Sequence, residues 1–335
     1  MSRRVKRLPR DVKVAYQVYE NPGKVPGPFV PYKYAASDEE NTALKNNAET
    51  YAWKDSDRNE VFPLLMLPGT SSAKERYHGL ASILCEKYGH TVITMDNRGI
   101  GESEGPESRG HSDDPALTLE DMAVDCLALA DALELPKFSL FGSSIGGCIA
   151  QYVALEQPQR LHKLLLACTH FGGPKYQAPG KRYRKLTSRP VPPMDDEDAW
   201  AEHQKRLFSI NFHHDFLQTE DFKTLLESFK DAQRLGGEVQ GEEAQSLAMS
   251  EFIETGLECE LMDRFELDNN FGVNTLVLTG DSDQIVPVEN SFKLRMCFPG
   301  SSMSVFTNAG HMFIEEKTEA VAKEIDEFLM QVHVD

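Results

Sequence analysis

Short apolar runs recur along the chain and alternate with segments of helical periodicity. Residues 12–19 alternate between apolar and polar side chains, as expected for a strand with one buried face. Six later runs are short and mostly apolar, which is typical of strands buried on both faces of a sheet. These six predicted strands are residues 62–67, 91–95, 138–141, 164–167, 275–279 and 303–306.

Four segments between these runs carry helix signals. They are residues 73–88, 118–134, 145–157 and 317–331. The second begins with Thr118 and Asp121, a pair that resembles a capping box, and its apolar residues repeat every three to four positions. Strands that alternate with helices need crossover connections. We therefore predict an α/β fold, with a mostly parallel central sheet and helices on both faces.

The alternation stops between residues 172 and 268, where no strand-like run occurs. Gly, Pro and basic residues come first, and helical segments with many aromatic and aliphatic side chains follow. We predict that residues 172–268 form a helical subdomain inserted into a core of residues 1–171 and 269–335. Residues 22–60 are rich in Pro, Asn, Asp and Lys, and are predicted to be an irregular insertion in the core.

The composition is that of a globular protein and narrows the range of partners. The 335 residues are 40% hydrophobic and 26% charged, which is enough apolar material for a large core. A formal net charge of −18 argues against a nucleic-acid partner, because phosphate binding needs a basic surface. No run of apolar residues is long enough to span a membrane. A homo-oligomer is compatible with the sequence but does not follow from it.

The cysteines and the N-terminus indicate a reduced, cytoplasmic setting. The six cysteines form no CxxC pair and no Cys/His cluster, so no metal site is expected. Cys126, Cys148 and Cys168 lie in apolar segments and are interpreted as small core residues. The first ten residues include five basic ones without an apolar stretch, which favours a solvated tail over a secretory signal.

The strongest chemical signal is a GxSxG motif formed by Gly142-Ser143-Ser144-Ile145-Gly146. It joins a predicted strand to a predicted helix, the context in which such a motif presents a nucleophile on a sharp turn. Gly142 and Gly146 would avoid Cβ clashes there, and the helix N-terminus would favour negative charge near the Ser144 hydroxyl. The alternative interpretation is a tight turn with a helix-capping serine.

Four further motifs each come near the end of a predicted strand. They are Pro68-Gly69-Thr70, the D-x-R-G-x-G-x-S pattern of residues 96–103, the loop of residues 280–287, and Ala309-Gly310-His311. With the GxSxG motif and in this order, they make most of residues 61–332 resemble the α/β-hydrolase superfamily, in which residues 280–287 correspond to the acid loop. The resemblance implies a Ser–Asp–His triad in chain order and no metal or organic cofactor.

In this resemblance Ser144 is the nucleophile and His311 is the base that takes its proton. Two aspartates, Asp281 and Asp283, compete for the acid that orients His311. The family places the acid three residues after the glycine that ends the strand, which favours Asp283; Asp281 would then be a structural loop residue.

The same resemblance implies an oxyanion hole made by the backbone N–H groups of Thr70 and Ile145. Pro68 stands where the family commonly has His, but the donor is a backbone group, so the hole should survive the change. The D-x-R-G-x-G-x-S segment is expected to be structural, with Arg98 tying strand ends together.

Superfamily members build a cap over the nucleophile where residues 172–268 lie. The expected substrate-lining residues are Ser71, Trp200, Phe208, Phe212 and Met312, although the aromatic ones can equally serve to hold the cap on the core. His213 and His214 are interpreted as surface or substrate-lining rather than catalytic. A basic run, which either is solvated or meets an anionic substrate group, comprises Lys175, Lys181, Arg182, Arg184, Lys185 and Arg189.

The sequence therefore predicts a cap-bearing serine esterase that cleaves an ester, lactone or thioester of a small, carbon-rich molecule. The cap and the 96–103 motif are similar to those of 3-oxoadipate enol-lactonases and polyketide methylesterases. Two alternatives remain: a cofactor-free C–C hydrolase, lyase or cyclising enzyme with the same triad, and a non-catalytic ligand receptor. A peptidase is less expected, and epoxide hydrolases and dehalogenases use an Asp where this chain has Ser144.

Overall fold

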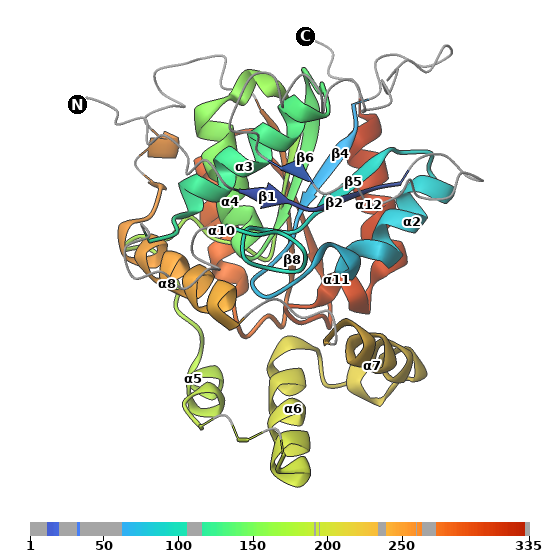
Figure 1. Ribbon diagram of the computed structural model, residues 1–335, viewed down its shortest axis with the longest axis vertical. Helices are drawn as coiled ribbons and strands as arrows, with labels where there is room; N and C mark the ends of the chain where they lie inside the picture. Colours follow the sequence, from blue (N-terminus) through green and yellow to red (C-terminus); the bar gives the residue numbers. More distant parts are fainter. Residues whose placement is uncertain are drawn as a thin grey trace.

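The computed structural model describes residues 12–19, 32–33, 62–105, 116–190, 192–193, 195–233, 239–258, 260–262 and 273–331. Its centre is a seven-stranded sheet in which β2 alone runs antiparallel to its neighbour (Figure 1). The predicted α/β fold with a mostly parallel sheet is thus confirmed. In spatial order the strands are β2 (Tyr16–Tyr19), β5 (Val92–Met95), β4 (Leu64–Leu67), β6 (Phe138–Ser143), β7 (Leu161–Ala167), β8 (Asn274–Gly280) and β9 (Ser302–Phe306).

The first predicted strand is divided in two at Ala15. β1 (Lys13–Val14) forms a separate antiparallel pair with β3 (Tyr32–Lys33). The Ala15 N–H donates to Ser103 Oγ at 2.8 Å, and its carbonyl accepts from Asp96 N at 2.8 Å, so a loop takes the place of a partner strand. Apart from β3, the predicted irregular insertion of residues 22–60 lies outside the described residues.

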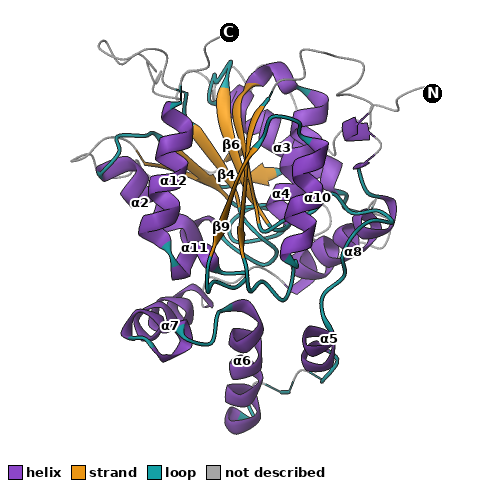
Figure 2. Cartoon of the chain, turned by 180° about the vertical axis from the view of Figure 1, so that it is seen from behind, coloured by secondary structure: helices purple, strands orange, loops and turns teal. Residues whose placement is uncertain are grey.

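Helices cover both faces of the sheet (Figure 2). α2 (His78–Glu86) and α12 (Thr318–Met330) bury apolar side chains against one face. α3 (Leu119–Ala132), α4 (Ile145–Glu156) and α10 (Val288–Cys297) do so against the other. Both hydrogen bonds of the predicted capping box are present: the Thr118 side chain accepts from Asp121 N, and the Asp121 side chain accepts from Thr118 N. The short helices of the core are η1 (Lys74–Tyr77), η3 (Pro158–Arg160) and α11 (Phe313–Glu316).

The loop of residues 96–103 has the structural role expected of it, but Arg98 acts differently from the prediction. Its guanidinium binds Asp125 of α3 with two bonds of 2.8 and 2.7 Å, and both side chains are buried. Asn97 connects the strand ends instead, because its Nδ2 donates to Pro68 O at 2.9 Å. The loop therefore anchors α3 to the sheet and holds the chain after β4.

The described part of residues 172–268 contains helices and no strand. α5, α6 and α7 lie beyond one end of the sheet (Figure 1), whereas α8 packs against α3. α8 contributes Ala248 and Phe252 to the main hydrophobic core, so it packs on the sheet domain. No helix among the described residues combines the length and the apolar character needed to cross a membrane. The bounds are α5 (Lys181–Thr187), α6 (Glu197–Asn211), η4 (Phe216–Gln218), α7 (Glu220–Gln233) and α8 (Val239–Thr255).

Candidate active site

Ser144 lies on the sharp turn between β6 and α4. Its backbone has φ 53° and ψ −122°, a conformation that is strained for a residue with a Cβ. Two bonds to the neighbouring strand segment hold it there: Ser144 N donates to Ala167 O at 2.9 Å, and Thr169 Oγ1 donates to Ser144 O at 2.7 Å. The Ser144 side chain does not cap α4. Its hydroxyl is therefore available for chemistry rather than used in the helix.

The two glycines of the motif allow this turn to pack between strand and helix. A Cβ at Gly142 would lie 2.3 Å from Gly146 O, and a Cβ at Gly146 would lie 2.3 Å from Leu67 O. Both contacts are with backbone atoms, which cannot move aside without displacing β4 or α4. Only glycine fits at either position.

His311 is paired with Asp283. His311 Nδ1 and Asp283 Oδ2 are 2.7 Å apart, and the carboxylate is fully buried. The other carboxylate oxygen accepts the N–H groups of Ile285 and Val286 at 2.8 and 2.9 Å. With Nδ1–H directed at the carboxylate, Nε2 remains as the acceptor. Asp281 is exposed and accepts from Ser282 Oγ and, at 3.5 Å, from Ala309 N.

The end of α6 holds the His311 loop on both sides. Met312 N donates to Asn211 O at 2.9 Å, and the Gly310 and His213 N–H groups donate to the same Glu316 oxygen at 2.8 and 3.1 Å. Burial raises the pKa of Glu316. The helical segment therefore contacts the backbone directly beside His311, an arrangement that no local motif indicates.

Ser144 and His311 line one cavity of about 530 Å³. Its walls come from the strand ends and from α5, α6 and α8, and they include Met312 as expected. The apolar side chains in these walls include Met249, Ile253, Ile285, Val286 and Ile314. The cavity is of a size that accepts a small organic molecule.

The other residues expected to line the cavity lie elsewhere in the described structure. Phe208 and Phe212 pack with Phe222, with ring centroids 5.4 and 5.5 Å from that of Phe222, and the cluster also includes Met312 of the cavity wall. Trp200 packs beside the ring of His203, and Ser71 N lies 3.5 Å from Gln245 Oε1 of α8. The aromatic spacing thus corresponds to packing within the helical segment and against Met312 of the His311 loop.

The two expected oxyanion donors are the backbone N–H groups of Thr70 and Ile145. In the described part of the chain, neither Thr70 N nor Ile145 N has a hydrogen-bond acceptor. Ile145 is the first residue of α4, whose opening N–H groups have no partner within the helix. A Cβ at Gly69 would be only 3.5 Å from Ser144 Cβ, so the chain after β4 runs directly beside the turn. These amides can therefore stabilise negative charge developing near Ser144.

Several cavity residues were not predicted from the sequence. Arg76 Nε lies 2.9 Å from Glu315 Oε1, which forms an ion pair within the cavity wall, and Arg76 also donates to Met312 Sδ. Tyr176 and Tyr183 reach the cavity from the chain before and within α5. Cys168, interpreted as a core residue, is buried but also lines the cavity. Burial raises its thiol pKa well above the ordinary value, so it remains a protonated thiol beside Ser144.

His170 is a further unpredicted cavity residue, and it is held neutral. Its side chain is 4% exposed and packs against the rings of Tyr176 and Phe252, with centroids 4.3 and 5.7 Å away. Its Nδ1 accepts the Gly172 N–H at 3.1 Å. Burial, with a smaller effect of His311, lowers the His170 pKa to about 3.

This neutrality predicts a pH dependence of stability. The folded pKa of His170 is about 3, against 6.5 for a free histidine, so the unfolded chain binds one more proton between these values. The free energy of unfolding should therefore fall as pH drops below about 6.5, by up to ~1.4 kcal/mol per pH unit from this group. Denaturant titrations of the wild type and His170→Gln should show a shallower slope for the variant. Equal slopes would contradict a buried neutral His170.

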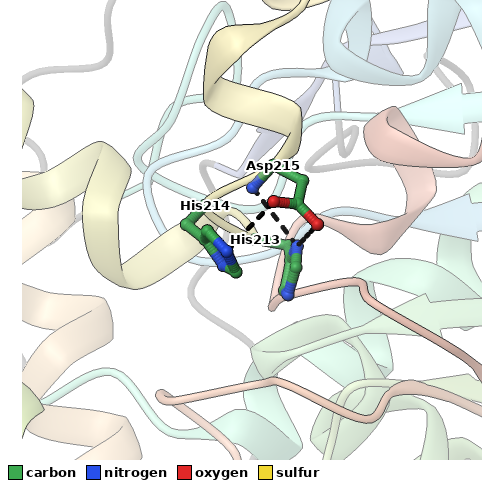
Figure 3. A group of neighbouring side chains, drawn as sticks. All are labelled: His213, His214 and Asp215. Carbon is green, nitrogen blue, oxygen red and sulfur yellow. Dashed lines mark hydrogen bonds and ion pairs between the residues drawn. The ribbon is translucent and has the colours of Figure 1, made fainter.

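His213, His214 and Asp215 form a group whose donor atoms lie within 4.8 Å of one another (Figure 3). Two of the three side chains are largely exposed, at 81% for His214 and 70% for Asp215. His213 Nδ1 already accepts from Asp215 N at 3.3 Å. Neither histidine is among the residues that line the cavity, and only His214 is exposed at the surface, because the His213 side chain is 11% exposed.

The parallel sheet, the serine at the turn after its central strand and the helices on both faces define the class of α/β hydrolases. Residues 63–318 match the family described as alpha/beta hydrolase fold, and the chain belongs to this family.

Relatives with known activities align over different portions of the chain. It is 27% identical to proline iminopeptidase from Lactobacillus helveticus over 298 residues, which cover 84% of this chain and 95% of the relative. It is 26% identical to 2-hydroxymuconate semialdehyde hydrolase from Pseudomonas putida over 295 residues, covering 82% and 89%. The sn-1-specific diacylglycerol lipase ABHD11 of Danio rerio is 34% identical over 132 residues, but the match spans only 38% of its length.

Solved structures agree on the fold. The enol-lactonase from Burkholderia xenovorans LB400 has a TM-score of 0.61 and 18% identity, with 83% of this chain and 94% of that chain covered. A thermophilic esterase from Thermogutta terrifontis has a TM-score of 0.58 and 25% identity, covering 82% and 91%. These relatives are hydrolases, and the chain is a hydrolase of the α/β-hydrolase type.

Proposed function

We propose that the protein is a serine hydrolase that cleaves an ester, lactone or thioester through an acyl-enzyme on Ser144. The observation that carries the proposal is the shared cavity. Ser144 lines it from a strained turn, and His311 lines it with its ring bonded to the buried Asp283 carboxylate. A serine, a histidine with one free ring nitrogen and a buried acid are the parts that nucleophilic acyl transfer requires.

In the proposed mechanism, His311 Nε2 takes the Ser144 proton as Oγ attacks the carbonyl carbon. The negative charge moves to the carbonyl oxygen, where the Thr70 and Ile145 N–H groups stabilise it. Collapse breaks the C–O or C–S bond, and the leaving group takes the proton from His311. Water then repeats the sequence on the acyl-enzyme and releases the acid. Asp283 stays ionised throughout and stabilises the protonated imidazole.

The proposed substrate class follows from the walls of the cavity. Met249 and Ile253 of α8 and Ile285 and Val286 after β8 favour a carbon-rich substrate. We further propose that residues 172–268 act as a cap, because Tyr183 of α5 and Asn211 of α6 contribute to the same walls. The relatedness to an esterase and the shared fold with an enol-lactonase support this class.

Hydrolysis of a C–C bond is the second candidate. The alignment with 2-hydroxymuconate semialdehyde hydrolase over 82% of this chain favours it, and the same serine–histidine pair can serve that reaction. The relatedness to proline iminopeptidase adds an aminoacyl amide as a substrate to compare.

A matched substrate panel tests the proposal. It comprises p-nitrophenyl esters of increasing chain length, γ- and δ-lactones, acyl thioesters, proline p-nitroanilide and a vinylogous 1,5-diketone. We expect kcat/KM for the best ester, lactone or thioester to exceed that for the anilide and the diketone by more than about tenfold. Faster turnover of the diketone would favour the C–C hydrolase, and faster turnover of the anilide would favour a peptidase. Ligand-induced stabilisation without turnover of any member would favour a receptor.

A further inference from the structure

His170 is a polar residue of the cavity wall that has no role in the proposed mechanism. It follows β7 by three residues and lies on the segment that contacts the nucleophile, since Thr169 Oγ1 donates to Ser144 O. Only 4% of His170 is exposed, yet it lines the cavity. Buried polar atoms usually have a hydrogen-bond partner, so the ring nitrogen of His170 that lacks one calls for an explanation.

Hydrogen bonding settles which ring nitrogen carries the proton. Nδ1 accepts the Gly172 N–H at 3.1 Å, so in the neutral ring the proton is on Nε2. In the described part of the chain, Nε2 has no hydrogen-bond partner. The rings of Tyr176 and Phe252 pack against His170 and restrict its rotation. The result is a fixed N–H donor on a residue that lines the cavity.

We propose that His170 Nε2–H binds a second oxygen of the substrate, separate from the carbonyl that Ser144 attacks. This inference rests on the proposed function and narrows its substrate class. The substrate would be an ester, lactone or thioester that carries an uncharged acceptor, such as a keto, hydroxyl or ether oxygen.

The surroundings favour an uncharged acceptor over a carboxylate. A buried carboxylate needs a cationic partner, and the nearby Arg76 is already paired with Glu315 at 2.9 Å. His170 also stays neutral beside His311, so it does not oppose the positive charge that His311 gains when it takes the Ser144 proton. A neutral donor therefore serves binding without impeding proton transfer.

The test compares substrates that differ by one oxygen. On the acyl side these are the p-nitrophenyl esters of hexanoate and of 3-, 4- and 5-oxohexanoate. On the alcohol side they are the hexanoate esters of 1-butanol and 2-methoxyethanol. The wild type should prefer at least one oxygen-bearing member over its partner by about 10–100-fold in kcat/KM, because the buried donor is otherwise left unpaired.

His170→Phe should reduce this preference to nearly one, and His170→Gln, whose amide can supply an N–H near the same place, should restore part of it. The preference is a ratio measured on one protein sample, so partial unfolding of a variant does not affect it. His203→Phe is the matched control: His203 is also a buried histidine, but it packs beside Trp200 and is not part of the cavity wall. It should keep the wild-type preference.

Two outcomes separate the failure of this inference from the failure of the proposed function. If the wild type hydrolyses the esters with no preference for any added oxygen, or if His170→Phe keeps the preference, the assignment of His170 is overturned. If the wild type hydrolyses none of the esters, the proposed function falls and the inference falls with it.

Discussion

Replacing Ser144 with alanine should reduce kcat for the best ester by about a million-fold, because the variant lacks the hydroxyl on which the proposed acyl-enzyme forms. Cys168 also lines the cavity, but burial keeps its thiol protonated, so it cannot substitute as a thiolate. Steady-state hydrolysis by wild type and Ser144→Ala, with the variant's folding checked by thermal unfolding, measures the effect.

Ser143→Ala is the control for this prediction. Ser143 is the neighbouring serine, and its hydroxyl is bonded to the buried Tyr77 hydroxyl. Loss of that bond should affect stability more than turnover, with kcat reduced by no more than about tenfold. A million-fold loss in Ser143→Ala together with an active Ser144→Ala would show that Ser143, and not Ser144, is the nucleophile.

Replacing Asp283 with asparagine should reduce kcat by about 10⁴-fold. The carboxylate holds His311 Nδ1–H at 2.7 Å, and an amide in its place favours the wrong tautomer of the imidazole. The change is nearly isosteric, so the loss should appear in kcat while the fold persists.

Asp281→Asn provides a matched comparison, because Asp281 precedes Asp283 by two residues but is exposed and bonded to Ser282 Oγ. We expect kcat within about threefold of the wild type for this variant, as for most surface substitutions. Equal losses in the two variants would show that the acid loop acts through its shape rather than through the Asp283 carboxylate.

The five inner strands of the sheet could be predicted from the sequence because they are buried on both faces and form continuous apolar runs. β9 was predicted to be buried in the same way, but it is the edge strand and none of its residues is fully buried. Elements without such a pattern were missed. α10 carries Phe292 and Met296 on its exposed side, at 52% and 77% exposure, so its apolar residues do not form one stripe. Lys163 interrupts the apolar run of β7, but it is buried where its ammonium donates to Phe328 O and, at 3.0 Å, to Leu329 O in the last turn of α12. That contact depends on the tertiary fold.

The same distinction holds for the candidate site. Ser144 and His311 lie in local motifs, since the chemistry fixes the residues immediately around them. His170 and the Arg76–Glu315 pair come from positions whose neighbours in sequence give no sign of the cavity, and only the packing of the chain brings them together. Aromatic residues at helical spacing, such as Phe208 and Phe212, cannot be divided by sequence alone between lining a pocket and packing the cap.

The central claim is that Ser144 is an activated nucleophile beside a working oxyanion hole. The most direct test is intact-mass measurement after reaction with a fluorophosphonate, on wild type, Ser144→Ala and Asp283→Asn in parallel. The account predicts one adduct on the wild type, on the peptide that contains Ser144, no adduct on Ser144→Ala and much slower labelling of Asp283→Asn. A folded wild type that gains no adduct, or an adduct that persists in Ser144→Ala, would contradict it.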